Sequence, residues 1–310
     1  MHTKTTLFIL VLGLSTIVLA MPDDLYSAEL ARPTTFGLML AGGVDYWSGD
    51  RVYDADGNKT LFSDTGTKSN HLLVPVKFGF HLPCPQWSWY LDLPILAQNY
   101  MAATGQVTQH DIGMANPWLV TRWIPELSEG LWLGPRAGLR IAGLSKTVVN
   151  VTGDTEMASG DKSWGFDIGL LFAWRPPEGK FRLDGQGGIR YLFPADYKLS
   201  IMGFTLFDYK ETPPLSARAE VAPGLAWANG WVTYAKAYGS FDISRSKMHD
   251  NITDFNTESD RSQIYGAGIR QSWEASPSNE LGLEFDYDLS GVLTEAGWHL
   301  IADYVGYLPL

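Results

Sequence analysis

Apolar residues recur at every second position along most of this chain, from about residue 34 to its end. A period of two is typical of β-strands, because successive side chains of an extended backbone point to opposite faces. The clearest case is residues 163–175, where aromatic and aliphatic side chains at even positions alternate with Gly165, Asp167 and Gly169. Helical spacing is nearly absent, so the pattern predicts an all-β protein.

Twelve segments of the chain show this alternation. An even number of strands of about ten residues is typical of closed outer-membrane barrels, because the hydrocarbon cannot satisfy an open sheet edge. We therefore predict a single antiparallel transmembrane β-barrel of about twelve strands over residues 34–310. The segments are 34–46, 71–82, 87–98, 111–124, 131–144, 163–175, 181–193, 214–228, 231–243, 261–274, 280–289 and 297–307.

The connections between these segments alternate in length, as periplasmic turns and extracellular loops of such barrels do. Short ones fall at 83–86, 125–130, 176–180, 229–230 and 275–279, and long ones at 47–69, 99–110, 145–161, 194–213 and 244–260. Only 290–296 is short where a long loop is expected. Most tryptophans flank the short turns, and Trp47, Trp164 and Trp298 lie beside the opposite strand ends, which indicates two aromatic girdles at the two membrane surfaces. The alternative is a soluble β-sandwich, but that fold gives no reason for tryptophan to gather at turns.

The first twenty residues have the sequence pattern of a targeting segment. Lys4 precedes an apolar run from Leu7 to Ala20, which ends in small residues. This pattern is typical of a secretory signal peptide over residues 1–20. Residues 21–33 precede the first strand and are a candidate plug. Together these features predict localisation to the outer membrane of a bacterial cell.

Composition narrows the range of functions. The chain carries 34 acidic and 23 basic residues, a net charge of -11, and this argues against nucleic acid as a partner. A single cysteine excludes a disulfide scaffold. Residues 54–58 resemble the start of a calcium loop, but the later ligands and the closing glutamate are missing. We therefore expect no metal site and no cofactor.

The polar face of the strands carries nine cations and ten anions, so a lumen lined by this face would be nearly neutral. Two interpretations of these charges remain open. They are ion pairs that fill a narrow barrel, or they line a path for a solute. As pore-lining residues we predict Lys77, Arg136, Arg140, Arg182, Arg190, Arg218, Glu220, Lys236, Arg270, Glu284, Asp286 and His299.

The same face contains the best candidate for chemistry. If the last hairpin turns near residues 292–293, Asp286 lies opposite His299, and such a pair could orient a base or bind a cation. A cross-strand ion pair that stabilises the closed barrel is the simpler interpretation. We therefore predict that the protein is not an enzyme, with a lipid-modifying enzyme or a closed structural barrel as alternatives.

Several glycine and aromatic spacings carry a family resemblance. They are Asp111-Ile112-Gly113 with Arg122-Trp123, Leu133 to Gly138, Trp164 to Gly169, Trp174-Arg175-Pro176, Leu183-Asp184, Gly187-Gly188, Arg190-Tyr191 and Tyr265 to Gly268. In these the chain resembles the outer-membrane transporter family associated with the meta-cleavage pathway of phenol degradation, which is related to channels for hydrophobic compounds. The resemblance implies a β-barrel that takes up hydrophobic molecules.

We therefore predict passive uptake of small hydrophobic or aromatic compounds across the outer membrane. Aromatic side chains suit apolar ligands, and we predict loop contacts to the solute from Tyr46, Trp47, Phe62 and Tyr100. The expected partners are outer-membrane lipid, the small-molecule solute and, during biogenesis, the barrel-assembly machinery.

Overall fold

The computed structural model describes residues 37–82, 87–102, 109–142, 163–201, 204–228, 230–276 and 279–309. The predicted signal peptide, the candidate plug at 21–33 and Cys84 lie outside the described residues. Within the described residues the chain is almost entirely extended, with one short helix, α2 (Phe62–Thr65). No helix in this part of the chain is long and apolar enough to cross a membrane.

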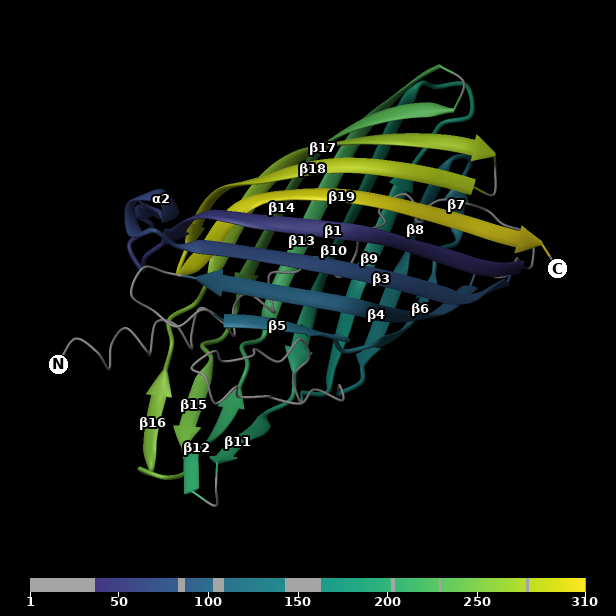
Figure 1. Cartoon of the computed structure of the whole chain (residues 1–310). Coiled ribbons are helices and arrows are strands. Elements are labelled where there is room, and N and C mark those ends of the chain that lie inside the picture. The colour runs from purple at the N-terminus through teal and green to yellow at the C-terminus, as the bar shows by residue number, and fades with distance from the viewer. Residues whose placement is uncertain are drawn as a thin grey trace.

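Twelve strands form a closed antiparallel barrel, in which each strand pairs with its neighbour along the chain and the last pairs with the first (Figure 1). The strands are β1 (Gly37–Tyr53), β3 (Lys68–Leu82), β4 (Trp87–Ala102), β6 (Trp118–Trp123), β8 (Leu131–Arg140), β9 (Gly165–Trp174), β10 (Phe181–Leu192), β13 (Ser216–Ala228), β14 (Trp231–Asp242), β17 (Gln263–Ser276), β18 (Asn279–Val292) and β19 (Thr294–Pro309). The prediction of a single antiparallel barrel of about twelve strands is confirmed.

Closure depends on the pairing of β19 with β1, which runs from Gly37 opposite Pro309 to Tyr53 opposite Thr294. This long ladder satisfies the backbone groups that would otherwise form two open sheet edges in the bilayer. The described chain begins and ends at one end of the barrel, which we call the short-turn end, because the short connections lie there. The opposite end, which carries α2, is the long-loop end (Figure 1).

Several predicted strand boundaries differ from the structure by a few residues, and three of the differences affect the interpretation. The predicted strand 111–124 is divided into β5 (Gln109–Gly113) and β6, with a break before Pro117, which has no backbone N–H to donate. Strand β1 continues to Tyr53, so Tyr46 and Trp47 lie in a strand and not in a loop. Strands β18 and β19 are separated only by Leu293, whose φ of 49° makes a tight reversal.

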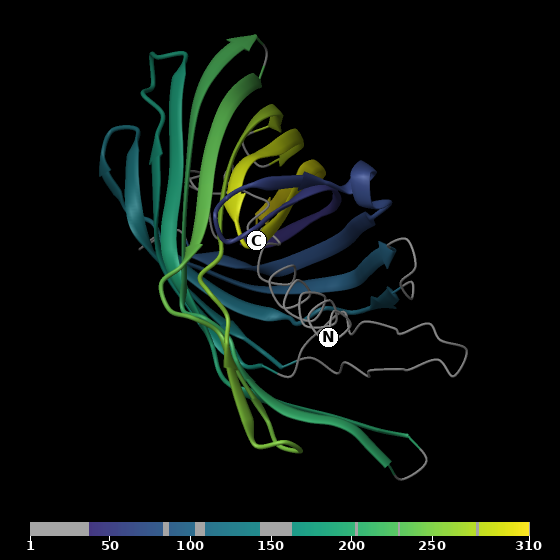
Figure 2. The ribbon, with the colours of Figure 1, turned by 90° about the vertical axis from the view of Figure 1, so that its left-hand side faces the viewer.

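Two of the predicted long loops contain paired strands that lie outside the barrel. β11 (Ala195–Ile201) and β12 (Phe204–Thr212) form one hairpin, and β15 (Lys247–Asp250) and β16 (Phe255–Glu258) form another. The hairpins pair through β12 and β15, so their backbone groups are satisfied outside the barrel. This small sheet projects beyond the long-loop end (Figures 1 and 2). Of the remaining short strands, β2 (Lys59–Leu61) pairs antiparallel with β1, and β7 (Glu126–Ser128) pairs antiparallel with β8.

The two faces of the barrel wall differ as the alternation predicts. On the outer face of β1, Leu38, Leu40 and Val44 are exposed, as apolar groups in contact with lipid would be. Indole rings stack on this outer face next to the short turns, with centroids 6.2 Å apart for Trp227 and Trp231. Of the two predicted girdles, the one at the short-turn end is therefore present. At the other end Trp164 is exposed, but Trp47 faces the lumen and does not belong to a girdle. The charged face points into the lumen.

Candidate functional site

The lumen contains a cavity of about 120 Å³ in its long-loop half. Its lining comes from eight barrel strands, β1, β3, β10, β13, β14, β17, β18 and β19. These strands meet there only because the sheet closes, since β1 and β19 are at opposite ends of the chain. The cavity is therefore a product of the barrel and belongs to no local motif.

One wall of the cavity is acidic and aromatic. Asp45 of β1 and His299 of β19 are in contact, with Asp45 Oδ1 3.4 Å from His299 Nδ1. Asp288 of β18 accepts hydrogen bonds from the Trp47 indole, at 3.5 Å, and from the Tyr238 hydroxyl, at 2.8 Å. Asp45 and Trp47 both point inward because they are two residues apart on β1, and alternate side chains of a strand lie on the same face.

The opposite wall is basic. Asp167 of β9 accepts hydrogen bonds from Arg136 at 2.7 Å, from Arg218 at 3.0 Å and from Arg190 at 3.3 Å. Arg190 and Arg218 also line the cavity. Together the four groups carry a formal charge of +2, and we call them the Asp167 cluster. Three cations around one buried carboxylate form a site of positive potential.

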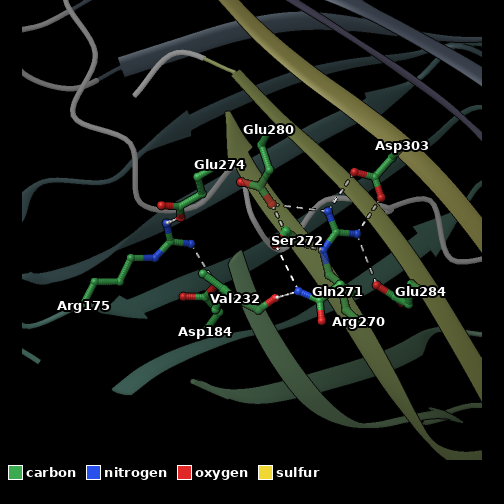
Figure 3. Close-up of polar contacts among 10 residues, drawn as sticks. All are labelled: Arg175, Asp184, Val232, Arg270, Gln271, Ser272, Glu274, Glu280, Glu284 and Asp303. Carbon is green, nitrogen blue, oxygen red and sulfur yellow. Dashed lines mark hydrogen bonds and ion pairs between the residues drawn. The ribbon is translucent and has the colours of Figure 1, made fainter. Parts of the chain in front are cut away.

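Below the cavity, toward the short-turn end, an arginine is surrounded by acids. Arg270 of β17 makes a two-pronged contact with Asp303 of β19 and lies 3.4 Å from Glu284 and 3.5 Å from Glu280 (Figure 3). Its Nε also donates to the Ser272 hydroxyl at 3.0 Å. Arg270, Glu280, Glu284 and Asp303 carry a formal charge of -2, and we call them the Arg270 cluster.

Lys236 of β14 connects the cavity to the Arg270 cluster. Its ammonium contacts both Glu284 and Asp286 of β18. Lys236 and Asp286 line the cavity, whereas Glu284 lies beneath it. The negative charge of the β18 acids is thus partly balanced by Lys236 of β14, which reaches them across β17.

The short-turn half of the lumen is packed with side chains. An apolar cluster of inward-facing residues fills the region next to β1 and β19, and it consists of Met39, Ala41, Tyr90, Trp118, Val120, Ile301, Val305 and Tyr307. Lys77 lies 3.6 Å from Asp92, and Arg122 donates to the Tyr307 hydroxyl at 3.1 Å. On the other side Arg175 donates to Asp184 at 2.9 Å (Figure 3). This half therefore resembles the core of a soluble protein.

The structure brings about half of the predicted pore-lining residues to the cavity. They are Arg190, Arg218, Glu220, Lys236, Asp286 and His299. The others lie elsewhere on the inward face and do not line the cavity, namely Lys77, Arg136, Arg140, Arg182, Arg270 and Glu284. Their role in transport stays a prediction.

The four predicted ligand-binding aromatic residues are separated. Trp47 lines the cavity. Tyr46, the preceding residue of β1, has its side chain on the opposite face of the strand, where its ring centroid lies 5.4 Å from that of Trp298. Phe62 is buried in α2, and Tyr100 lies in β4 rather than in a loop. Of the four, only Trp47 is placed where a solute in the cavity would touch it.

Sequence reasoning missed several lining residues, among them Asp45, His71, Tyr238 and Glu295. The alternation of apolar and polar residues indicated that Asp45 and His71 point inward. It could not show that their strands, β1 and β3, border the cavity. Glu295 was missed because it was assigned to a connection, whereas it lies in β19.

The predicted opposition of Asp286 and His299 is confirmed, because the two residues are paired in the β18–β19 register. Their side chains nevertheless have different partners, since His299 contacts Asp45 and Asp286 contacts Lys236. His299 is only 8% exposed and lies inside the barrel. This arrangement gives a lipid substrate in the bilayer no direct access to the imidazole.

At the long-loop end, charged groups interact on the surface. Lys247 donates to Glu258 at 2.9 Å, and this hydrogen bond with the Lys247 charge holds the pKa of Glu258 below its ordinary value of 4.5. In the loop predicted to resemble a calcium site, Asp54 Oδ1 accepts backbone hydrogen bonds from Asp56 and Asn58. Among the described residues, no group of three or more metal-ligating side chains is arranged to hold a metal ion.

Comparison with known proteins identifies the fold of this chain but not its family. No family model matches the chain, and no curated protein does. Among solved structures, the COG4313 outer membrane channel from Pseudomonas putida F1 is similar, with a TM-score of 0.69, 12% identity, and coverage of 89% of this chain and 96% of that chain.

Other similar structures have different described roles. The translocator domain of the autotransporter NalP from Neisseria meningitidis has a TM-score of 0.56, with 13% identity over 95% of this chain and 96% of that one. A variant of the monoaromatic hydrocarbon channel TodX has a TM-score of 0.50, with 10% identity over 88% of this chain and 90% of that one. The chain thus has the fold of outer-membrane β-barrels, which serves more than one function.

Proposed function

We propose that this barrel is a channel for passive uptake of small hydrophobic or aromatic compounds across the bacterial outer membrane. The observation that carries the proposal is the cavity in the long-loop half of the lumen. Trp47, Tyr238 and Ile264 line it, so it offers aromatic and aliphatic surface inside a charged lumen. Apolar surface with a few placed polar groups is typical of small-molecule sites.

The solute class is supported by two further points. The similar structures include one described as a monoaromatic hydrocarbon channel, and the sequence resembles transporters associated with phenol degradation. The chemistry of the cavity agrees, because an indole face binds flat apolar molecules through dispersion and its quadrupole. We propose no chemical step, and the association with phenol degradation stays a prediction.

Passage beyond the cavity has two routes. The packed short-turn half makes an axial route dependent on movement of buried side chains such as Tyr90 and Trp118. A lateral route would lead through the wall into the bilayer, and it would not require the short-turn half to open. In both routes the solute enters from the long-loop end, which we assign to the extracellular side because outer-membrane barrels carry their long loops there.

The test is single-channel conductance of the refolded mature chain in planar bilayers, paired with uptake of small solutes by liposomes. We expect uptake of small aromatic solutes above the rate of protein-free liposomes. Discrete openings would indicate the axial route, and uptake without conductance would indicate the lateral one. A folded barrel that shows neither conductance nor uptake contradicts the proposal.

A closed structural barrel is the second candidate, and the packing of the short-turn half favours it. Core-like packing of Met39, Ile301 and Val305 stabilises a barrel whether or not anything crosses it. This candidate predicts no conductance, no uptake and tolerance of changes at Trp47. Loss of uptake on Trp47→Ala, with the barrel still folded, would decide against it.

A further inference from the structure

Three acids of the cavity, Asp45, Asp288 and Glu295, share one wall, and neutral groups donate hydrogen bonds to two of them. Ser69 donates to Glu295 at 2.9 Å, and Asp288 accepts from Tyr238, from Trp47 and from the backbone N–H of Gly297. All of these donors are neutral groups. Asp45 of β1 lies on the same wall and contacts His299. Neutral donors stabilise a carboxylate without cancelling its field, so this wall attracts a cation.

The facing wall has the opposite sign. Arg190 and Arg218 border the cavity and belong to the Asp167 cluster, whose formal charge is +2. Glu220 is on the same wall, where Gln186 donates to it at 3.3 Å, and its charge reduces the excess to +1. The Arg218 side chain is 23% exposed, so part of it borders the open space. This wall therefore attracts an anion.

Between the two walls the lining is apolar. Trp47, Ile264 and the small residues Ala217 and Ala219 supply it. The cavity volume of about 120 Å³ is close to that of about 150 Å³ at which apolar protein cavities bind benzene. The space therefore suits one ring or a body of similar size.

From this arrangement we infer that the cavity selects small compounds with an apolar body and opposite charges at their two ends. The cationic end lies at Asp45, Asp288 and Glu295, and the anionic end at Arg190 and Arg218. The inference rests on the proposed uptake function and narrows its solute class from aromatic to zwitterionic. A field across the lumen orients such a solute, whereas a singly charged one is attracted by one wall and repelled by the other.

A matched series of probes tests the inference. The series is 4-(aminomethyl)benzoate, benzylamine, benzoate and benzyl alcohol, which share a benzyl or phenyl body and differ in charge. Binding to the wild-type barrel in detergent is measured by calorimetry at neutral pH. We expect the zwitterion to bind at least about tenfold more tightly than each of the others, because both ends gain a charged hydrogen bond. Equal or tighter binding of any other probe overturns the inference.

Two variants assign the ends of the site. Glu295→Gln is expected to weaken binding of the zwitterion and of benzylamine by about tenfold and to leave benzoate within about twofold. Arg218→Gln is expected to weaken the zwitterion and benzoate by a similar factor and to leave benzylamine within about twofold. Glu178→Gln, an exposed acid in a short turn, is the control for a change of net charge. If Glu178→Gln acts as Glu295→Gln does, the local assignment is overturned.

Liposome uptake of the three charged probes separates this inference from the proposed function. Selective binding without uptake would support the site and contradict a channel. Uptake of all three probes at similar rates, with similar binding, would support a channel and overturn the selectivity. The wild-type probe series stands by itself if a variant fails to fold.

Discussion

Two charged clusters in the lumen are near mirror images in composition. In the Asp167 cluster one carboxylate holds three guanidinium groups, and in the Arg270 cluster one guanidinium holds three carboxylates. Their formal charges are +2 and -2, so they cancel in a count over the whole lumen. They lie on different strands, the first on β8, β9, β10 and β13 and the second on β17, β18 and β19.

The difference shows that a neutral lumen can be strongly polarised. Alternating cations and anions along a strand would give short-range pairs and little field. Here like charges are gathered around a single counter-charge, which holds them together against their mutual repulsion. Removal of that central group should therefore matter more than removal of any group around it.

The largest effect is expected for Arg270→Gln. Arg270 is 1% exposed, so its loss leaves three buried carboxylates without their central cation. We expect the free energy of unfolding to fall by about 3–5 kcal/mol, as for other broken buried ion pairs. Urea unfolding of the barrel in detergent measures this. Arg245→Gln, in the exposed connection between β14 and β15, is the control, and an equal loss there would contradict the prediction.

A smaller loss is expected for Asp167→Asn. Three guanidinium groups then face one another, but Arg218 borders the cavity, and water there screens part of the repulsion. We expect a decrease of about 2–3 kcal/mol in the same unfolding measurement. A loss larger than that of Arg270→Gln would show that the clusters do not differ in solvent access as the structure indicates.

A double variant sharpens the comparison further. Adding Arg136→Gln to Asp167→Asn removes one of the repelling cations, so it should restore about 1 kcal/mol relative to Asp167→Asn alone. In the wild-type background Arg136→Gln should destabilise, because Arg136 donates to Asp167 at 2.7 Å. A double-mutant cycle compares the four barrels, and strictly additive losses would contradict the coupling.

The smallest effect is expected for the exposed ion pair of Lys247 and Glu258 outside the lumen. Because the pKa of Glu258 is held below 4.5, the pair stabilises β15–β16 above that pH and loses this contribution as acid protonates the carboxylate. Amide hydrogen exchange of β16 at neutral and acid pH measures the change. In Glu258→Gln the acid-induced change should shrink, and an undiminished change would assign it to other groups. Solvent screening keeps the effect small.

The strand pattern could be predicted well because it depends on local alternation. Each inward charge, such as Asp167 or Arg270, is marked by its parity relative to apolar neighbours, and the barrel follows from the even strand count. The clusters could not be predicted in this way. Arg136 and Arg218 meet at Asp167 because β8, β9, β10 and β13 are neighbours with a particular stagger. The long arginine side chains also point inward and reach across the intervening strands.

The case of His299 illustrates the same limit. Hairpin geometry predicted its register partner, Asp286, correctly. Its actual side-chain contact, Asp45, lies on the first strand, which reaches β19 only through closure of the barrel. Backbone pairing between consecutive strands is a local property, whereas the choice of side-chain partner depends on what the whole lumen offers.

By itself the sequence determined the strands, which residues face lipid and which face inward, and the short-turn girdle. These features follow from a period of two and from the preference of indole for the membrane surface. Only the tertiary structure decided that the short-turn half is packed, that a cavity remains in the long-loop half, and that its walls carry opposite charge. The physical reason is that barrel closure and strand stagger set which inward side chains meet, and neither is encoded in any single segment of the chain.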